Sequence, residues 1–172
     1  MASIAHLSRR FVGSLRPGGP PGPEADWARS HLSDAERELW DSMSGPDRRH
    51  SVEVARRVER ALGHEASRPI LAAALLHDVG KTVAGLRTYG RVVATLSAMV
   101  GGHSMADHWA RKRGFTRKVG LYLMHDELGA DLLELAGSDP LTVTWTREHH
   151  WPESMWTLDT RTARALKDAD DD

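Results

Sequence analysis

Residues 70–81 read ILAAALLHDVGK, and this stretch decides the fold. From Ile70 to Val79 apolar side chains surround the axis, which indicates a helix that is buried on every side. Gly80 is predicted to end that helix in the left-handed conformation. His77 and Asp78 occupy its last turn, so the stretch carries two ionisable side chains into a core from which charge is normally excluded.

The segments before this stretch predict helices that would cover it. Ala25–Met43 predicts two helical pieces, the second capped by Ser33, with Glu36 three residues on to complete a capping box. Pro46–Leu62 predicts a helix with proline in its first turn. His50 lies on the apolar stripe of the predicted Pro46–Leu62 helix. A third ionisable side chain therefore faces the expected core.

The segments after the stretch also favour helix throughout. The expected helices are Arg91–Val100, His103–Lys112, Arg117–Leu135, Leu141–Trp151 and Thr160–Asp172. His125, His149 and Asp170 fall on the apolar faces of the last three. Sustained β-branched alternation is missing and no internal repeat is present, so the fold class is predicted to be all-α.

Composition limits the chemistry that these side chains can perform. The 172 residues carry 23 Lys plus Arg against 24 Asp plus Glu, a formal net charge of −1, which gives no overall attraction to nucleic acid or anionic membrane. There is no cysteine, which excludes disulfides and thiolate ligands. A bound metal would therefore be held by imidazole and carboxylate, a donor set that suits zinc, iron or manganese.

The chain is expected to form one folded domain with a short N-terminal extension. Residues 1–24 are interpreted as an N-terminal segment and a linker, because RPGGPPGPE at 16–24 is rich in helix-breaking proline and glycine. Residues 25–172 would form the domain. Neither a membrane-spanning stretch nor a secretory signal is indicated, so a cytoplasmic protein is expected, with its oligomeric state left open.

Six ionisable side chains on apolar helix faces form the candidate site. A buried charge without a partner loses its hydration, so such side chains are expected to pair with one another or to bind metal. Converging inward faces are how helical proteins build metal sites. The six are His50, His77, Asp78, His125, His149 and Asp170.

The order of these residues resembles the HD-domain superfamily of metal-dependent phosphohydrolases. The matching segments are RRHSVEVA with His50, LLHDVGK with His77 and Asp78, and LKDAD with Asp170. HDELGADLL from His125 and EHHWPE with His149 and His150 are similar to the added histidines of its two-metal branch. That branch includes the HD-GYP cyclic di-nucleotide phosphodiesterases and the HD-type dinucleoside tetraphosphate hydrolases, and the fold implied is an HD-domain helical bundle.

The resemblance implies a ligand set and a reaction. Two divalent transition metal ions (iron, manganese or zinc) are expected. The resemblance assigns His50, His77, Asp78 and Asp170 to one metal, with Asp78 bridging to a second held by His125, His149 and His150. Asp78 and Lys81 are the predicted catalytic residues, with Lys81 binding a phosphate oxygen. The implied function is hydrolysis of a phosphoester or phosphoanhydride bond in a small, nucleotide-like substrate by a metal-activated hydroxide.

Two departures from the family pattern restrict the expected class of substrate, and a third concerns a predicted metal ligand. EHHWPESMW lacks the Gly-Tyr-Pro element, which argues against cyclic di-nucleotides, and Val-Gly-Lys after the His-Asp pair replaces the acidic pair of the alarmone hydrolases. Asp170 lies two residues from the end of the sequence, where helices fray, and Asp168 is the fallback ligand.

Several alternatives stay open at the sequence level. Adjacent helical residues point about 100° apart, so His149 and His150 are not both expected to face one metal. A one-metal phosphatase, in which His125 and His149 only pack, is one rival. A catalytically silent HD-domain sensor or interaction scaffold is the other. Nucleic acid is not expected as the main partner, because no basic face is evident.

Overall fold

The computed structural model describes residues 18–86, 90, 94 and 105–171, and this part of the chain is helical with no β-strand. The all-α prediction is therefore confirmed. Its α-helices are α2 (Gly22–Ser30), α3 (Asp34–Ser42), α4 (Gly45–Leu62), α5 (Arg68–Leu76), α6 (Lys81–Ala84), α8 (Ala106–Ala110), α9 (Gly114–Leu123), α10 (His125–Leu135), α11 (Pro140–Glu148) and α12 (Thr160–Asp171), with short 3-10 turns at Gly63–Glu65 and Glu153–Met155.

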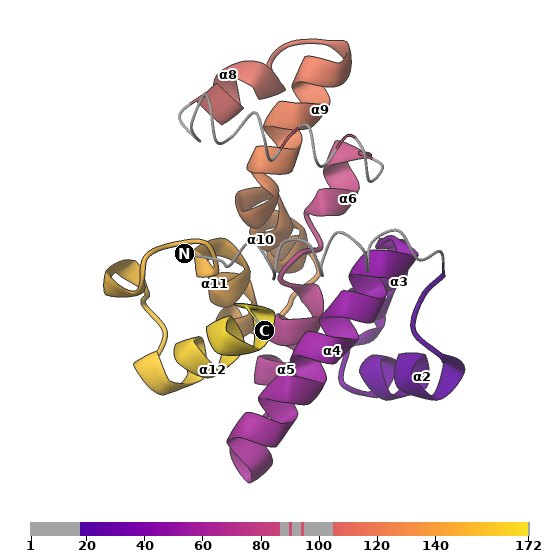
Figure 1. The fold of residues 1–172 in the computed structure, drawn as a ribbon, viewed down its shortest axis with the longest axis vertical. Coiled ribbons are helices and arrows are strands. Elements are labelled where there is room, and N and C mark those ends of the chain that lie inside the picture. Colours follow the sequence, from indigo (N-terminus) through magenta and orange to yellow (C-terminus); the bar gives the residue numbers. More distant parts are fainter. Residues whose placement is uncertain (1–17, 87–89, 91–93, 95–104, 172) are drawn as a thin grey trace.

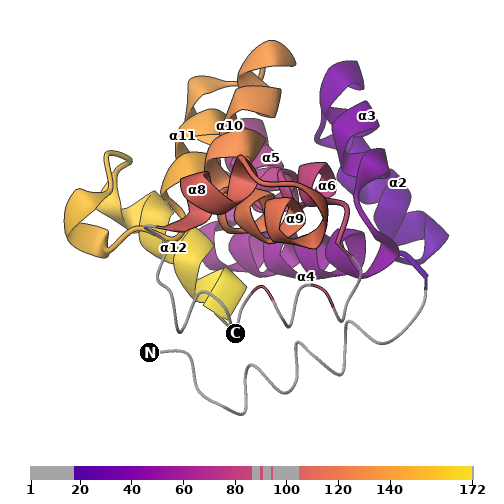
Figure 2. The same cartoon turned by 90° about the horizontal axis from the view of Figure 1, so that it is seen from above.

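Helix α5 lies at the centre of the main helical layer, where it contacts α3, α4, α11 and α12 (Figures 1 and 2). Every residue from Ile70 to Leu76 is buried, as the apolar stretch predicted. Three consecutive alanines at 72–74 let neighbouring helices approach its backbone closely. Each fully buried leucine contributes about 1.5–3 kcal/mol through apolar burial, so α5 anchors the larger core cluster.

A second, smaller core joins α6, α8 and α9. In Figure 1 these helices lie at one end of the long axis, beyond α10 and away from α12. Their buried side chains are small or aliphatic, among them Ala84, Ala106, Val119 and Leu123. Helices α6, α8 and α9 therefore pack as a small lobe beyond the main layer.

The N-terminal half follows the sequence prediction except at its start. Ser33 and Glu36 form the expected capping box of α3, and Gly63, with a φ of 56°, ends α4. The prediction that residues 16–24 form no helix is wrong for Gly22–Glu24, because α2 begins at Gly22. Its proline lies in the first turn, where the missing N–H has no helical acceptor.

Two boundaries near the centre also differ from the prediction. Helix α5 ends at Leu76, so His77 is its C-cap and Asp78 lies in the turn beyond. Gly80 is not left-handed, since its φ is −63°. Its lack of a side chain serves packing instead: a Cβ at Gly80 would overlap the carbonyl oxygen of His125 and lie 2.6 Å from the amide nitrogen of Gly129.

The predicted helix Arg117–Leu135 is interrupted. Helix α9 ends at Leu123 and α10 begins at His125, with Met124 at φ −105° and ψ 18° between them. The apolar face predicted for this segment, which included His125 and Leu135, is right at His125, which is buried, and wrong at Leu135, which is 88% exposed. The other buried residues of α10 are Gly129, Ala130 and Leu133, and the small ones let α10 pack against the Gly80 turn.

The remaining predictions concern the C-terminal helices and the termini. Helix α12 forms where it was expected, with Ala163, Leu166 and Asp170 buried, whereas α11 ends at Glu148, before its predicted end at Trp151. The helix predicted at 91–100 lies outside the described residues apart from residue 94. So does the N-terminal segment up to residue 17, and the division into 1–24 and 25–172 stays a prediction. Within the described ranges, none of the helices combines the length and apolarity needed to cross a bilayer.

The Gly80 packing yields the first test. Gly80→Ala is expected to lower the free energy of unfolding by about 3 kcal/mol, because the new methyl group meets backbone atoms that cannot rotate away. Gly22→Ala is the matched control, since a Cβ there has open space and the change should be about 1 kcal/mol or less. Urea denaturation followed by circular dichroism measures both. Equal stability of the two variants would contradict the close approach.

Candidate metal centre

The structure brings all seven predicted ligands into one contiguous cluster. They come from five places in the fold: His50 from α4, His77 and Asp78 from the end of α5, His125 from the start of α10, His149 and His150 from the end of α11, and Asp170 from α12. His77, Asp78, His125, His149 and Asp170 are buried. A cluster of this composition inside a core must be neutralised internally or by a cation.

The first group of ligands surrounds His77. One ligand atom each from His50, His77 and Asp78 lies within 4.8 Å of the others. Asp170 joins this group, since its Oδ1 is 2.9 Å from His50 Nε2 and 3.6 Å from His77 Nε2. Asp168, the fallback ligand, is exposed and takes no part.

The end of α12 is held in place by a contact that the sequence did not reveal. Arg57 donates from Nη1 to the carbonyl oxygen of Ala169 at 3.2 Å. Asp170 is only 5% exposed even though it lies near the end of the sequence. The last turn of α12 is therefore packed against the domain and is tied to α4 by this hydrogen bond, which opposes the fraying expected at a helix end.

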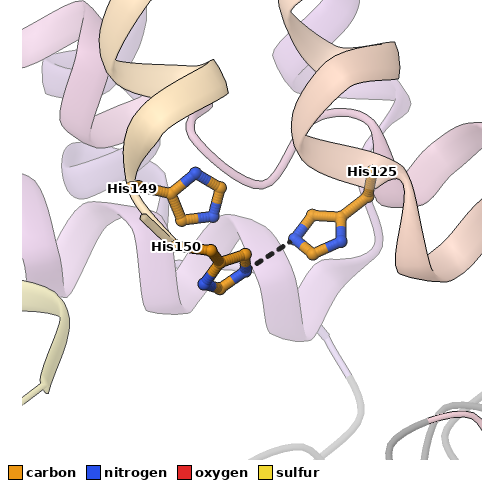
Figure 3. A group of neighbouring side chains, drawn as sticks. All are labelled: His125, His149 and His150. Carbon is orange, nitrogen blue, oxygen red and sulfur yellow. Dashed lines mark hydrogen bonds between the residues drawn. The ribbon is translucent and has the colours of Figure 1, made fainter. Parts of the chain in front are cut away.

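The second group consists of His125, His149 and His150, whose ligand atoms also lie within 4.8 Å of one another. Figure 3 shows His149 and His150 at the end of α11 facing His125 across a small gap. The Nε2 atoms of His150 and His125 are 3.2 Å apart. The two adjacent imidazoles therefore both reach the second group, although the helical spacing had argued against using both.

Asp78 lies between the two groups and presents one oxygen to each. Its Oδ2 is 3.5 Å from His77 Nε2 on the first side. Its Oδ1 is 3.4 Å from His125 Nε2 and 4.0 Å from His149 Nε2 on the second side. A carboxylate placed in this way has the geometry required of a bridging ligand.

Backbone hydrogen bonds orient the three buried imidazoles. Nδ1 of His77, His125 and His149 lies 2.7–2.9 Å from the carbonyl oxygen three residues earlier in each case. A carbonyl oxygen only accepts, so each Nδ1 carries the proton and donates it. Nε2 is thereby left as the metal-binding atom, an arrangement that second-sphere contacts commonly impose on metal-binding histidines.

Two of these Nε2 atoms have no hydrogen-bond partner. The Nε2 atoms of His77 and His149 are fully buried, and no group in the described part of the chain makes a hydrogen bond of acceptable geometry to either. Leaving a buried polar atom unsatisfied costs about 1–3 kcal/mol. Because both atoms point at Asp78, divalent cations beside that carboxylate would satisfy them, and the donor set of imidazole and carboxylate fits iron, manganese or zinc.

Asp78 and His149 are held in the charge states that bind a cation, whereas His77 is drawn toward its protonated form by the nearby carboxylates. Burial alone would raise the pKa of the Asp78 carboxyl, but Lys81 and His77 outweigh burial and hold that pKa well below its usual range. Burial alone would lower the pKa of His77, but the carboxylates of Asp78 and Asp170 outweigh it and raise the pKa. In the second group, burial and then the neighbouring imidazoles lower the pKa of His149, which keeps its ring neutral.

Lys81 lies beside the bridging carboxylate. Its Nζ is 2.5 Å from Asp78 Oδ2, three residues back along the chain, and about 12% of its side chain is exposed. The ring of Tyr122 lies 6.0 Å from the same ammonium group. The residue thus places a positive charge at the solvent-facing edge of the cluster. The sequence offers three further basic residues as weaker phosphate-binding candidates: Arg87, Lys112 and Arg147. Arg147 pairs with Glu134, and Lys112 lies in the α8–α9 turn. Arg87 lies outside the described residues.

Glu148 is a buried acid beside His149 to which the sequence analysis assigned no role. Its carboxylate accepts hydrogen bonds from the backbone N–H of Thr157 at 2.8 Å and from the Thr157 hydroxyl at 2.6 Å. These bonds close the loop that follows His149 and His150. The signal in the sequence was a buried acid beside two histidines, but its partner is nine residues away across an irregular loop.

Comparison with known proteins gives one match. Residues 48–171 match the family model described as HD domain, a span that contains all seven clustered ligands and Lys81. Neither the search of curated proteins nor the search of solved structures found a match.

The unsatisfied Nε2 atoms predict that divalent metal stabilises the fold. Adding manganese, iron or zinc at 100 times its dissociation constant should raise the free energy of unfolding by about 2.7 kcal/mol. Asp78→Asn should abolish this gain because it removes the charge that both groups share. Asp171→Asn is the control, since Asp171 is exposed and pairs with Lys167. Thermal unfolding with and without metal gives the answer, and an undiminished gain in Asp78→Asn would argue against the centre.

The loop contact predicts a positioning role for Glu148. Glu148→Ala is expected to weaken metal binding roughly 10- to 100-fold, in the range seen when groups that orient metal ligands are removed. Glu148→Gln should recover part of the loss because its amide oxygen still accepts one bond. Glu153→Ala is the control, because Glu153 lies in the same loop but pairs with Arg164 at the surface. Calorimetric titration with the metal checks these values, and tight binding by Glu148→Ala would refute the role.

Proposed function

This chain belongs to the HD-domain family, and from that premise we propose that it is a metal-dependent phosphohydrolase acting on a small, nucleotide-like substrate. The observation that carries the proposal is the position of Asp78, with one carboxylate oxygen toward each group of histidines. A centre that served only to stabilise the fold would need one closed set of ligands. Two half-sets that share a carboxylate favour a pair of ions, and pairs of this kind are typical of phosphoryl chemistry.

Bound at such a centre, two divalent ions would lower the pKa of water and neutralise charge on a phosphoryl group during in-line attack. The protein side chains prepare the site for this chemistry. The backbone carbonyl groups that accept from Nδ1 of His77, His125 and His149 keep the imidazoles oriented before substrate arrives. Preorganised groups need no rearrangement at the moment of reaction, which is how fixed charges lower an activation barrier.

Lys81 supplies the charge that recognises the substrate. Its ammonium group pairs with Asp78 Oδ2 in this structure and also reaches the solvent-facing edge of the cluster. A lysine is a compact charge on a flexible stem, so it can turn from a carboxylate toward a phosphate oxygen without moving the backbone. We assign it to binding the phosphoryl group that is cleaved. The proposed reaction adds water across the P–O bond and releases the leaving group with a proton.

Metal counting together with an activity assay tests the proposed function. Protein purified without chelator is expected to contain close to two transition metal ions per chain and to hydrolyse a generic phosphodiester or members of a nucleotide panel. Asp78→Ala should lose both the ions and the activity. A single ion with full activity would favour the one-metal phosphatase. A folded, metal-containing protein that is inactive on every substrate would favour the sensor or scaffold.

The role of Lys81 is tested separately. Lys81→Gln is expected to keep its metal but to lower kcat roughly 100-fold or more, the size of effect found when one charge-stabilising donor is removed from an active site. Lys167→Gln is the matched control, because Lys167 also pairs with an aspartate, Asp171, but lies outside the cluster. Steady-state kinetics on the best substrate of the panel, with metal content measured in parallel, decides the outcome. Unchanged kinetics in Lys81→Gln would remove this residue from the mechanism.

A further inference from the structure

The turn between α8 and α9 concentrates positive charge on a projecting surface. Residues 111–118 read RKRGFTRK, with five basic side chains among eight residues, and all eight are exposed. We propose that this segment, the basic tip, docks the protein onto the surface of an anionic phospholipid bilayer. The proposal is independent of the proposed catalytic function, because it requires neither metal nor substrate.

The charge of the basic tip belongs to a wider asymmetry along the chain. Residues 79–125 contain eight Lys plus Arg but a single acidic residue, Asp107. Of the 23 basic and 24 acidic residues in the chain, this leaves 15 basic and 23 acidic for the remainder. A net charge near zero therefore hides a basic lobe on an otherwise acidic protein. The net charge of the whole chain gave no sign of this surface, which is why the sequence analysis expected no basic face.

Intramolecular ion pairing does not account for these charges. Arg111 pairs with Asp107 at 2.8 Å. No acidic side chain in the described ranges pairs with Lys112, Arg113, Arg117 or Lys118, and the sequence of residues 87–104 contains no aspartate or glutamate. Four neighbouring cations repel one another, so their clustering costs folding energy that an anionic partner would recover.

Helix α9 gains no local stability from the charges either. Arg113 occupies its N-cap without a side-chain capping bond, and the first turn contains no acidic residue. Positive charge near a helix N-terminus opposes the helix dipole. The arrangement runs against both capping and dipole preferences, and positions where such local rules are broken are expected to serve function.

The exposed aromatic ring in the same segment favours a bilayer over nucleic acid. Phe115 is 51% exposed in the middle of the basic residues. Proteins that bind single strands stack bases on aromatic rings inside a charged groove. Here the ring and the charges belong to the α8–α9 connection and the first turns of α9, and these two helices lie at one end of the long axis of the molecule (Figure 1). An exposed segment that combines cations with an apolar ring suits a flat interface, where the cations meet lipid phosphates and the ring enters the acyl boundary.

The basic tip is linked to the metal centre by a single helix. Helix α9 runs from Gly114 to Leu123, and the ligand His125 follows after one intervening residue. Ten helical residues span roughly 15 Å. Docking through the tip would therefore hold the catalytic centre close to the bilayer surface without burying it, where it would act on substrates near the membrane.

Vesicle flotation of the full chain tests the docking. The wild-type protein is expected to float with phosphatidylcholine vesicles that contain phosphatidylserine and not with pure phosphatidylcholine vesicles. The binding should weaken between 0.1 M and 1 M salt, as the Debye length falls from about 10 Å to about 3 Å. Lys112→Glu with Arg113→Glu should weaken it roughly 30-fold or more.

A charge-matched control separates local docking from net charge. Arg60→Glu with Arg161→Glu changes the net charge by the same amount at exposed positions outside the tip and should retain binding. Phe115→Ala should weaken binding to the anionic vesicles to the same degree at low and at high salt, because it removes an apolar contact and no charge. Circular dichroism verifies that each variant is folded. The proposal is overturned if wild-type protein ignores the anionic vesicles, if the control loses as much binding as the tip variant, or if a single-stranded oligonucleotide binds the tip in preference to the vesicles.

Discussion

The carboxylate of Asp78 is the constraint on which the rest of this structure depends. It is buried at the end of the most apolar helix, and the surrounding His77 and Lys81 keep it ionised. A lone charge in such a place would destabilise the fold, so each neighbouring element contributes a group that compensates for it. The imidazoles approach its two oxygens from opposite sides, and two of them keep a free Nε2. The fold is thus organised around a buried negative charge that bound divalent cations would neutralise.

The packing of the scaffold serves this arrangement. Gly80 lets the start of α10 approach the turn after Asp78 closely enough for His125 to reach the carboxylate. The Glu148 carboxylate ties down the loop after α11, and Arg57 ties down the end of α12. These contacts link elements that are far apart in sequence, so the ligand geometry is a property of the tertiary structure. Precise orientation of ligands is what separates a metal centre from a cluster of buried histidines.

Much of this could be predicted from the sequence, because periodicity reports burial. The apolar stretch before His77 predicted a central helix, the Ser33 capping box predicted a boundary, and the stripes predicted which histidines face inward. Features decided by tertiary contact escaped prediction. Hydrophobicity favoured Leu135 as a core residue, whereas close packing at Gly129 turned the other face of α10 inward. The break at Met124 also left no local signal, since no proline or glycine marks it. The ligand roles themselves stay predictions.

Anomalous diffraction from crystals grown with manganese would test the central claim most directly. The account predicts two peaks, one on each side of the Asp78 carboxylate. The first should contact His50, His77 and Asp170, and the second should contact His125, His149 and His150, with Asp78 between them. A single peak that leaves Nε2 of His149 without a partner would reduce the centre to one metal. The absence of any peak beside Asp78 in folded protein would contradict the account.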